Sequence, residues 1–330
     1  MYRLGLIGAG RIGIIHGLNA VAHPKAQLVA LTDADPVAAD SLAARTGAAV
    51  RTTEEIIASP DIDAILICSP TDTHSDLIEQ SARAGKAIFC EKPIDLSVER
   101  AARAVAVAEE AKVPLMIAFQ RRFDPHLSTL QRQLRDGVIG QTEIITIMSR
   151  DPAPPPVSYI KRSGGLYRDA MIHDFDEARF LLGEEPVEVF ALGSCMVDPA
   201  IGEAGDVDTA AVLLRTASGA ICQISVSRRA TYGHDQRVEV LGSKGLLRTG
   251  NIHETTVEHA SSSGFLQAPV LNFFLERYAA AYKIELDAFL EHLEKGTSPT
   301  PTGYDGLMAL RIADAATKSR ETGLPVRVQA

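Results

Sequence analysis

Asp169 and His173 are four residues apart in a segment whose apolar spacing predicts a helix over about 167–182. Residues at this separation project from one face of a helix, so the carboxylate and the imidazole are expected to be neighbours. A carboxylate can fix the tautomer of an adjoining imidazole and stabilise the cation formed when the ring accepts a proton. The pair predicts general-base chemistry, and the alternative interpretation is an ordinary surface pair.

A metal site is a competing interpretation of the same helix. Asp174, Asp176 and Glu177 follow His173 closely, and carboxylates are common metal ligands. A second histidine at ligand spacing is missing from the segment, which disfavours a metal of the zinc type. We therefore expect no bound metal.

Lys92 occupies a second position where chemistry is expected. It stands in the sequence Glu91-Lys92-Pro93, directly after an apolar run over 87–90 that predicts a buried strand. Ligands of parallel sheets bind at the carboxyl ends of the strands. Pro93 restricts the turn, which suits a side chain held in one direction. The alternative is a solvated surface lysine.

A Gly-x-Gly-x-x-Gly motif, formed by Gly8, Gly10 and Gly13, follows a short apolar run over 3–7 and opens a segment with helical apolar spacing. The glycines permit a tight turn and a close backbone approach to a pyrophosphate, whose charge is stabilised at a helix N-terminus. Asp33 ends the second apolar run, where a carboxylate accepts hydrogen bonds from ribose hydroxyls. A 2′-phosphate would be repelled there and no arginine follows directly, so NAD is favoured over NADP.

The elements that must position these residues form two regions of different pattern. In the first, continuously apolar runs alternate with helical segments, and such runs are typical of strands covered on both faces. The pattern predicts an α/β domain with a parallel sheet and helices on both sides. The expected strands cover 3–7, 27–32, 64–68, 87–90 and 115–119, and the expected helices cover about 12–22, 36–46, 76–84 and 97–112.

After about residue 119 short strands follow one another, which predicts a mostly antiparallel sheet in an α+β domain. A proline-rich connection over 151–163 is long enough to suggest a functional loop. We expect domains at 1–120 and 121–330, with a helix over about 303–321 that can pack back on the first. The expected elements are helices over 125–136, 167–182, 273–294 and 303–321, and strands over 143–149, 188–197, 209–215, 220–228, 237–241 and 255–259.

Composition excludes several classes of function. The 330 residues are 46% apolar and 23% charged, as in soluble globular proteins. The net charge is −9, and no basic run offers a nucleic-acid surface. There is no membrane-spanning stretch and no secretory signal at the N-terminus. Four widely spaced cysteines indicate free thiols in a reducing compartment, so we expect a cytoplasmic protein.

Together these features resemble the Gfo/Idh/MocA oxidoreductase family over essentially the whole chain. The resemblance rests on the motifs at 8–13 and 91–93 and on Asp169 with His173. It implies an N-terminal Rossmann domain and a C-terminal domain built on a large open, mostly antiparallel sheet. Within the family, the inositol 2-dehydrogenases are the most similar, through segments 119–124, 163–176 and 232–240.

The resemblance implies NAD-dependent oxidation of a secondary ring hydroxyl of a cyclic polyol, with myo-inositol giving 2-keto-myo-inositol (scyllo-inosose) and NADH. It implies that Lys92 orients and polarises the reacting hydroxyl, that His173 accepts its proton and that Asp169 completes the acid–base pair. Cofactor contacts are implied for Gly8, Gly10, Arg11, Ile12, Gly13, Asp33, Ser69, Thr71, His74, Glu91 and Lys92. Substrate contacts are implied for Lys92, Arg121, Asp151, Asp169, His173 and Tyr232.

Two departures from the inositol-type pattern leave the polyol open. His234 stands where an aromatic residue is usual, and Ser149 stands where some members have a histidine. The alternatives are an NAD(P)-dependent dehydrogenase for another inositol isomer or an aldose, a non-catalytic NAD-binding sensor, and an enzyme that uses NAD transiently in elimination or hydrolysis.

We also expect a homo-oligomer, a tetramer or a dimer. An open sheet with one exposed apolar face is normally covered by a partner, and the alternation of residues over 220–227 is compatible with such a face.

Overall fold

A computed structural model describes residues 1–329, and its contacts divide the chain into two compact units. Unit 1 comprises Met1–Phe123 and Ala281–Leu310, and unit 2 comprises Asp124–Ala280 and the chain from Arg311 onward. The units are therefore not two consecutive segments. Residues 281–310 belong to unit 1 because three apolar side chains of this stretch are buried in its core: Leu286, Phe289 and Leu290.

Unit 1 is built on a six-stranded parallel sheet in the order β3-β2-β1-β4-β5-β6. The strand order reverses between β1 and β4, and ligands of such sheets bind at this switch point. The predicted Rossmann fold is confirmed. The strands are β1 (Tyr2–Ile7), β2 (Ala26–Thr32), β3 (Ala49–Val50), β4 (Ala64–Ile67), β5 (Ala87–Glu91) and β6 (Leu115–Ala118).

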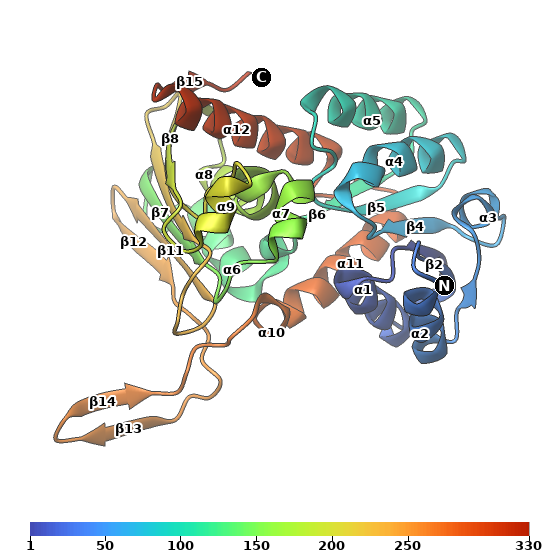
Figure 1. Ribbon diagram of the computed structural model, residues 1–330, viewed down its shortest axis with the longest axis horizontal. Coiled ribbons are helices and arrows are strands. Elements are labelled where there is room, and N and C mark those ends of the chain that lie inside the picture. The colour runs from blue at the N-terminus through green and yellow to red at the C-terminus, as the bar shows by residue number, and fades with distance from the viewer. Residues whose placement is uncertain (330) are drawn as a thin grey trace. The chain divides into compact units, whose positions relative to one another are not determined.

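Helices cover both faces of this sheet, with α1 and α2 on one side and α4 and α5 on the other (Figure 1). Side chains cap the N-termini of two of these helices. Asp35 accepts a hydrogen bond from the Val37 N–H at the start of α2, and Ser97 accepts one from the Arg100 N–H at the start of α5. The helices are α1 (Arg11–Ala22), α2 (Pro36–Thr46), α3 (Thr53–Ala58), α4 (His74–Arg83), α5 (Val98–Glu110) and α11 (Ala279–Lys295), with short 3₁₀ turns η1 (Thr71–Thr73) and η2 (Gln120–Phe123).

Unit 2 is built on a seven-stranded sheet in the order β12-β11-β7-β10-β9-β8-β15. Only the β7–β10 pair is parallel, so the expected mostly antiparallel sheet is confirmed. The strands are β7 (Thr142–Arg150), β8 (Pro186–Ser194), β9 (Thr209–Thr216), β10 (Ile221–Ser227), β11 (Asp235–Gly242), β12 (Gly245–Thr249) and β15 (Val326–Arg327).

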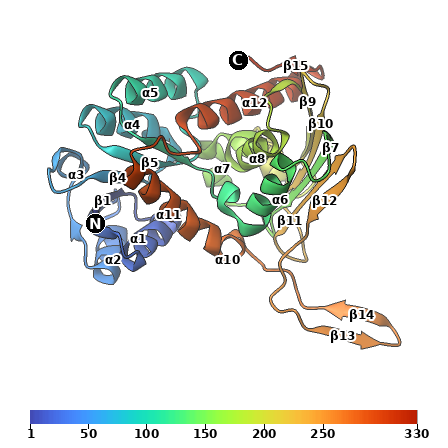
Figure 2. The same ribbon diagram turned by 180° about the vertical axis from the view of Figure 1, so that it is seen from behind.

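One face of this sheet packs against helices, as Figure 2 shows. Alternate strand residues such as Ile145, Val212 and Ile224 are buried with Phe175 in the core. A separate hairpin of β13 (Glu258–Ser261) and β14 (Gly264–Gln267) projects from the unit (Figure 1). The helices are α6 (Pro125–Arg135), α7 (Val157–Ser163), α8 (Ile172–Leu182), α9 (Pro199–Glu203), α10 (Phe274–Arg277) and α12 (Gly303–Thr322), which runs on from unit 1, with the π-helical turn η3 (Leu166–Ala170).

Several expected elements differ from those observed, and the strand expected over 255–259 begins only at Glu258, as β13. The proline-rich connection contains α7, which begins directly after the last proline of the cluster, Pro156. The helix expected over 167–182 is two pieces, because the Met171 N–H donates to the Leu166 carbonyl and closes a π turn before α8 begins. The helix expected over 273–294 is divided at Tyr278 into α10 and α11. Within residues 1–329, no helix is both long enough and apolar enough to cross a membrane.

Candidate active site

The glycine turn of unit 1 is shaped to leave space for a ligand. Gly8 has φ +104°, and a Cβ there would lie 2.5 Å from the Cys68 carbonyl carbon and oxygen. A Cβ on Gly13 would lie 1.9 Å from the Gly8 oxygen, so α1 packs tightly on the turn. A Cβ on Gly10 would meet nothing within 4 Å. The two outer glycines thus close the turn while the middle one faces open space.

The N-terminus of α1 is free to receive negative charge. Gly10 is its N-cap and supplies no side-chain cap, and the first turn contains no acidic residue. The exposed N–H groups and the helix dipole together favour an anion such as a pyrophosphate. Arg11 is exposed and Ile12 half-buried at this end of the helix.

Asp33 follows β2 at the same edge of the sheet. Its carboxylate accepts hydrogen bonds from the Ala9 N–H at 2.5 Å and from the Asp35 N–H at 2.8 Å. These bonds fix the carboxylate beside the glycine turn, where it can accept ribose hydroxyls. The residues present therefore fit NAD.

The segment after β4 supplies Ser69 and Thr71, both half-buried. The hydroxyls of Ser69 and Thr73 lie 2.6 Å apart, and Thr73 also donates to the Pro70 carbonyl at 2.7 Å. These bonds give residues 69–73, the cofactor-side segment, a defined conformation. Ser69 and Thr71 therefore remain candidates for cofactor contact.

Glu91 and Lys92 stand at the carboxyl end of β5. Cys90 of β5 is in register with Ile67 of β4, and Ile67 with Ile7 of β1, so Lys92 shares its edge of the sheet with the glycine turn. Lys92 is half-buried and Glu91 is buried. Arg121 follows the neighbouring strand β6 in η2 and is also buried, which places it in unit 1.

His74 lies at the start of α4 and is 1% exposed. Its Nδ1 is 2.8 Å from the Pro93 carbonyl oxygen and its Nε2 is 2.8 Å from the Ser69 carbonyl oxygen. Burial lowers the pKa of His74, against the two carbonyl groups, which raise it. Both ring nitrogens thus face protein backbone, so a supporting role fits His74 better than a direct cofactor contact.

A buried polar cluster lies behind Lys92, and two of its members were not predicted from the sequence. His16 of α1 is fully buried, with its Nε2 2.9 Å from Glu91 Oε1. Glu285 of α11 is also fully buried, and neither carboxyl oxygen has a hydrogen-bond partner among the described residues. Burial raises the pKa of Glu285 well above its ordinary value, and Glu91 raises it further. In the sequence, the signal that could have found His16 and Glu285 is a polar residue on the otherwise apolar face of an expected helix.

Asp169 and His173 belong to unit 2. Asp169 lies in the π turn, where its Oδ1 accepts the Tyr159 hydroxyl at 3.0 Å and its Oδ2 is 4.0 Å from Nη2 of the buried Arg228. His173 is half-buried in the first turn of α8. The Asp169 carboxylate thus lies between a hydroxyl donor and a guanidinium group of the same unit.

The acidic residues that follow His173 lie in the protein interior. Asp174, Asp176 and Glu177 are buried, and Asp176 lies 3.5 Å from Nη1 of Arg179. In the part of the chain that the structure describes, no three His, Cys, Asp or Glu side chains are grouped to hold a metal ion.

The other predicted substrate residues, Asp151 and Tyr232, also belong to unit 2. Asp151 Oδ1 is 3.3 Å from Nδ1 of the buried His234. The Tyr232 hydroxyl donates to Asp235 Oδ2 at 2.7 Å and accepts from Arg150 Nη1 at 3.1 Å. Both candidates are therefore held by neighbouring polar side chains at the ends of β7 and β11.

The buried Asp235 predicts a pH-dependent stability. Burial opposes its ionisation, but hydrogen bonds from Arg237, Tyr232 and Asn251 lower its pKa to about 2. A lowered pKa stabilises the fold above the pKa of the unfolded state, about 3.9, and this contribution is lost as the pH falls toward 2. Asp235→Asn should therefore reduce the free energy of unfolding at pH 7 by roughly 1–2 kcal/mol.

The difference between wild type and Asp235→Asn should shrink between about pH 4 and pH 2. Denaturant titrations over this range measure it, with Glu239→Gln, an exposed carboxylate of the same strand, as the control. A difference that stays constant with pH would contradict this prediction.

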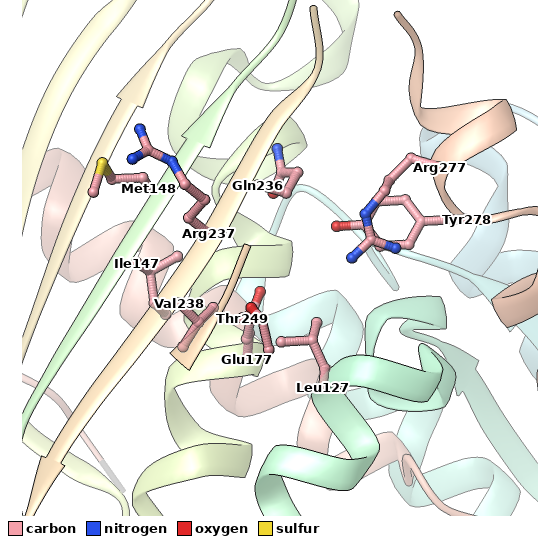
Figure 3. A pocket seen from close by; sticks show the side chains of 10 residues that line it. All are labelled: Leu127, Ile147, Met148, Glu177, Gln236, Arg237, Val238, Thr249, Arg277 and Tyr278. Carbon is pink, nitrogen blue, oxygen red and sulfur yellow. The ribbon is translucent and has the colours of Figure 1, made fainter. Parts of the chain in front are cut away.

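An enclosed cavity of unit 2 is too small to be the substrate site. It measures about 10 Å³ and lies among side chains of β7, β11, β12, α6, α8 and the end of α10 (Figure 3). A volume of this size admits a water molecule at most. Its lining residues are Leu127, Ile147, Met148, Glu177, Gln236, Arg237, Val238, Thr249, Arg277 and Tyr278.

The candidate residues thus form two groups. The dinucleotide candidates, Lys92 and Arg121 lie in unit 1, whereas Asp151, Asp169, His173 and Tyr232 lie in unit 2.

Comparison with known proteins identifies relatives over the whole length. Residues 2–119 match the model of an oxidoreductase family with an NAD-binding Rossmann fold, and residues 131–328 match the C-terminal α/β domain of the same family. An inositol 2-dehydrogenase from Rhizobium meliloti is 53% identical over 96% of each chain. A myo-inositol 2-dehydrogenase from Thermotoga maritima is 45% identical, covering 99% of this chain and 98% of the relative.

Among solved structures, a scyllo-inositol dehydrogenase from Lactobacillus casei with bound NAD(H) and scyllo-inositol is similar, with a TM-score of 0.93 and 30% identity over all of both chains. Both halves of the chain therefore match one family, and the glycine turn and Asp33 have the geometry that its cofactor needs. The chain belongs to the Gfo/Idh/MocA oxidoreductase family and has its NAD-binding Rossmann domain.

Proposed function

We propose that this protein oxidises the C2 hydroxyl of myo-inositol with NAD, giving 2-keto-myo-inositol (scyllo-inosose) and NADH. Cofactor binding is assigned to residues 1–120 and substrate binding mainly to 121–330. The observation that carries the proposal is the shared sheet edge that holds the glycine turn, Asp33 and Lys92. The names of the relatives from Rhizobium meliloti and Thermotoga maritima support the choice of substrate.

The chemistry divides between the cofactor and the protein. NAD, when bound, accepts the hydride that leaves the alcohol carbon. His173 would accept the hydroxyl proton as general base, so that the carbon–oxygen bond becomes a carbonyl. Lys92 would orient the reacting oxygen and stabilise negative charge that develops on it. Asp169, which lies 4.0 Å from Arg228, would stabilise the imidazolium of His173.

The remaining polyol hydroxyls need several polar partners. We assign Arg121, Asp151 and Tyr232 to this role, since each is fixed in place or buried in its own unit. A site built to hydrogen-bond hydroxyls rejects analogues that lack them, so this set would select a fully hydroxylated ring. His234 beside Asp151 replaces the aromatic residue expected there and favours a second candidate, oxidation of another inositol isomer such as scyllo-inositol.

The proposal is tested by following NADH absorbance with purified protein, NAD and a panel of myo-, scyllo- and chiro-inositol and aldoses, repeated with NADP. We expect myo-inositol with NAD to give the highest kcat/KM and NADP to give little turnover, because Asp33 repels a 2′-phosphate. A higher kcat/KM for scyllo-inositol would favour the second candidate. NAD binding without turnover of any alcohol would overturn the proposed reaction.

We further propose that the protein forms a homo-oligomer, a tetramer or a dimer, through the uncovered face of the unit 2 sheet. Leu246, Leu241, Ile144 and Ile221 form a row on this face, because each is in register with the next on β12, β11, β7 and β10. Each of them is at least 40% exposed. A contiguous apolar row of this kind is normally covered by a partner.

Placing a charge in this row should dissociate the oligomer. Ile221→Lys is expected to lower the molar mass measured by light scattering to that of a smaller assembly, because an ammonium group would be buried without a partner. Val37→Lys on the exposed surface of α2 is the matched control. An unchanged molar mass for Ile221→Lys would contradict the proposed interface.

A cytoplasmic location is part of the same proposal. All four cysteines are free; Cys90 and Cys222 are buried and Cys68 is half-buried. Burial raises the thiol pKa of these three well above its ordinary value. Free thiols are typical of a reducing compartment.

A further inference from the structure

Two buried histidines of unit 1 hold the chain on either side of Lys92. His16 binds the side chain of Glu91, the residue before Lys92, and His74 lies against the carbonyl of Pro93, the residue after it. His16 belongs to α1, which begins at the glycine turn. The second ring nitrogen of His74 faces the Ser69 carbonyl in the cofactor-side segment after β4.

We propose that His74 is a positioning residue for Lys92: its ring lies between the Pro93 and Ser69 carbonyls, with one ring nitrogen 2.8 Å from each oxygen, and so holds the residue after Lys92 in register with the cofactor-side segment. This inference rests on the proposed function, because it takes Lys92 as the residue that orients the reacting hydroxyl.

The surroundings of His74 leave it little freedom to do anything else. The side chain is 1% exposed, and both nitrogens lie at hydrogen-bonding distance from backbone oxygens. The hydroxyl of the next residue, Ser75, donates a hydrogen bond to the Ile94 carbonyl at 3.3 Å. Side chains of α4 therefore contact the carbonyls of both Pro93 and Ile94, the two residues after Lys92. A rigid ring between two loops transmits displacement of one loop to the other.

His16 fixes the chain on the other side of Lys92, through the side chain of Glu91. Its Nε2 is 2.9 Å from Glu91 Oε1, and the ring packs edge-on against Phe89 at 4.9 Å and Tyr282 at 5.7 Å. Glu91, before Lys92, is therefore bound to α1 through His16. Pro93, after Lys92, is linked to the cofactor-side segment through His74. Both ties run to elements that carry candidate cofactor residues, which would couple dinucleotide binding to the position of the lysine.

Two substitutions separate the two carbonyl contacts of His74, of which a neutral ring can make only one as an N–H donor. An asparagine amide can occupy the place of Nδ1 and keep the bond to the Pro93 carbonyl, whereas a glutamine amide can reach the place of Nε2 and keep the bond to the Ser69 carbonyl. Loss of a supporting contact around a reacting group typically costs 10- to 100-fold. The two variants should therefore fail in different ways.

His74→Gln should lower kcat for myo-inositol roughly 10- to 100-fold with an NAD dissociation constant close to wild type. His74→Asn should keep kcat within a few-fold of wild type and weaken NAD binding. Ile56→Ala, a buried core change in α3, controls for lost stability, which thermal unfolding measures in all variants. Equal losses of kcat in both His74 variants, or no loss in either, would overturn the proposal.

A readout independent of turnover distinguishes this proposal from the proposed function. The acetylation rate of the Lys92 amine with acetic anhydride, measured by mass spectrometry, should change several-fold in His74→Gln and stay at the wild-type value in His74→Asn. If the wild type oxidises no polyol, the proposed function fails while this measurement still decides the positioning role. Identical Lys92 reactivity in both variants would overturn it.

Discussion

Replacing His173 with alanine is expected to lower kcat by roughly 10²–10⁴, because the hydroxyl proton then has no general base positioned to accept it. The NAD dissociation constant should stay within a few-fold of wild type, since the dinucleotide candidates lie in unit 1 and His173 lies in unit 2. Stopped-flow measurement of NADH formation and a binding titration with NAD provide the two values.

The matched control is His259→Ala, which removes an exposed histidine of the same unit on β13. It should leave both values unchanged. A kcat for His173→Ala within a few-fold of wild type would show that another group accepts the proton. Loss of NAD binding together with kcat would instead indicate a damaged fold, and thermal unfolding would detect it.

Lys92→Met is expected to lower kcat roughly 10²–10³-fold, the usual cost of removing one donor from a developing oxyanion. Methionine keeps much of the length and volume of the side chain but removes its charge. Lys92→Arg should recover only part of the loss, because a planar guanidinium does not replace a compact ammonium group at a single oxygen. Rates with saturating NAD and myo-inositol measure the effect.

Lys25→Met is the matched control, because Lys25 forms an exposed ion pair with Glu294 in the same unit. Exposed pairs of this kind contribute little to stability. If Lys92→Met kept the wild-type kcat and only raised KM, Lys92 would bind substrate without assisting the chemical step.

Much of unit 1 could be predicted from the sequence because each signal is local. The apolar runs that became β1, β2, β4, β5 and β6 are covered on both faces, and Asp33 and Lys92 stand directly after two of them. Since parallel strands place their carboxyl ends at one edge, sequence order alone predicts which residues share the edge. NAD binding follows from the same local pattern.

The parts that could not be predicted depend on contacts between distant segments. Residues 281–310 join unit 1 because Phe289 packs on Phe89, with ring centroids 5.6 Å apart, and no periodicity in either segment encodes that partnership. The π turn before α8 depends on a single backbone bond from Met171 to Leu166. The proposed positioning role of His74 depends on two backbone carbonyl groups, and because every residue has such a group, the sequence carries no signal for these contacts.

The most direct test of the proposed reaction follows the hydrogen that leaves the substrate. Myo-inositol labelled with deuterium at C2 is oxidised with NAD, and the dinucleotide product is analysed by mass spectrometry. The account predicts one deuterium in each reduced dinucleotide and a ketone at C2 of the ring. Unlabelled NADH would contradict it, because the hydride would then have come from a different carbon.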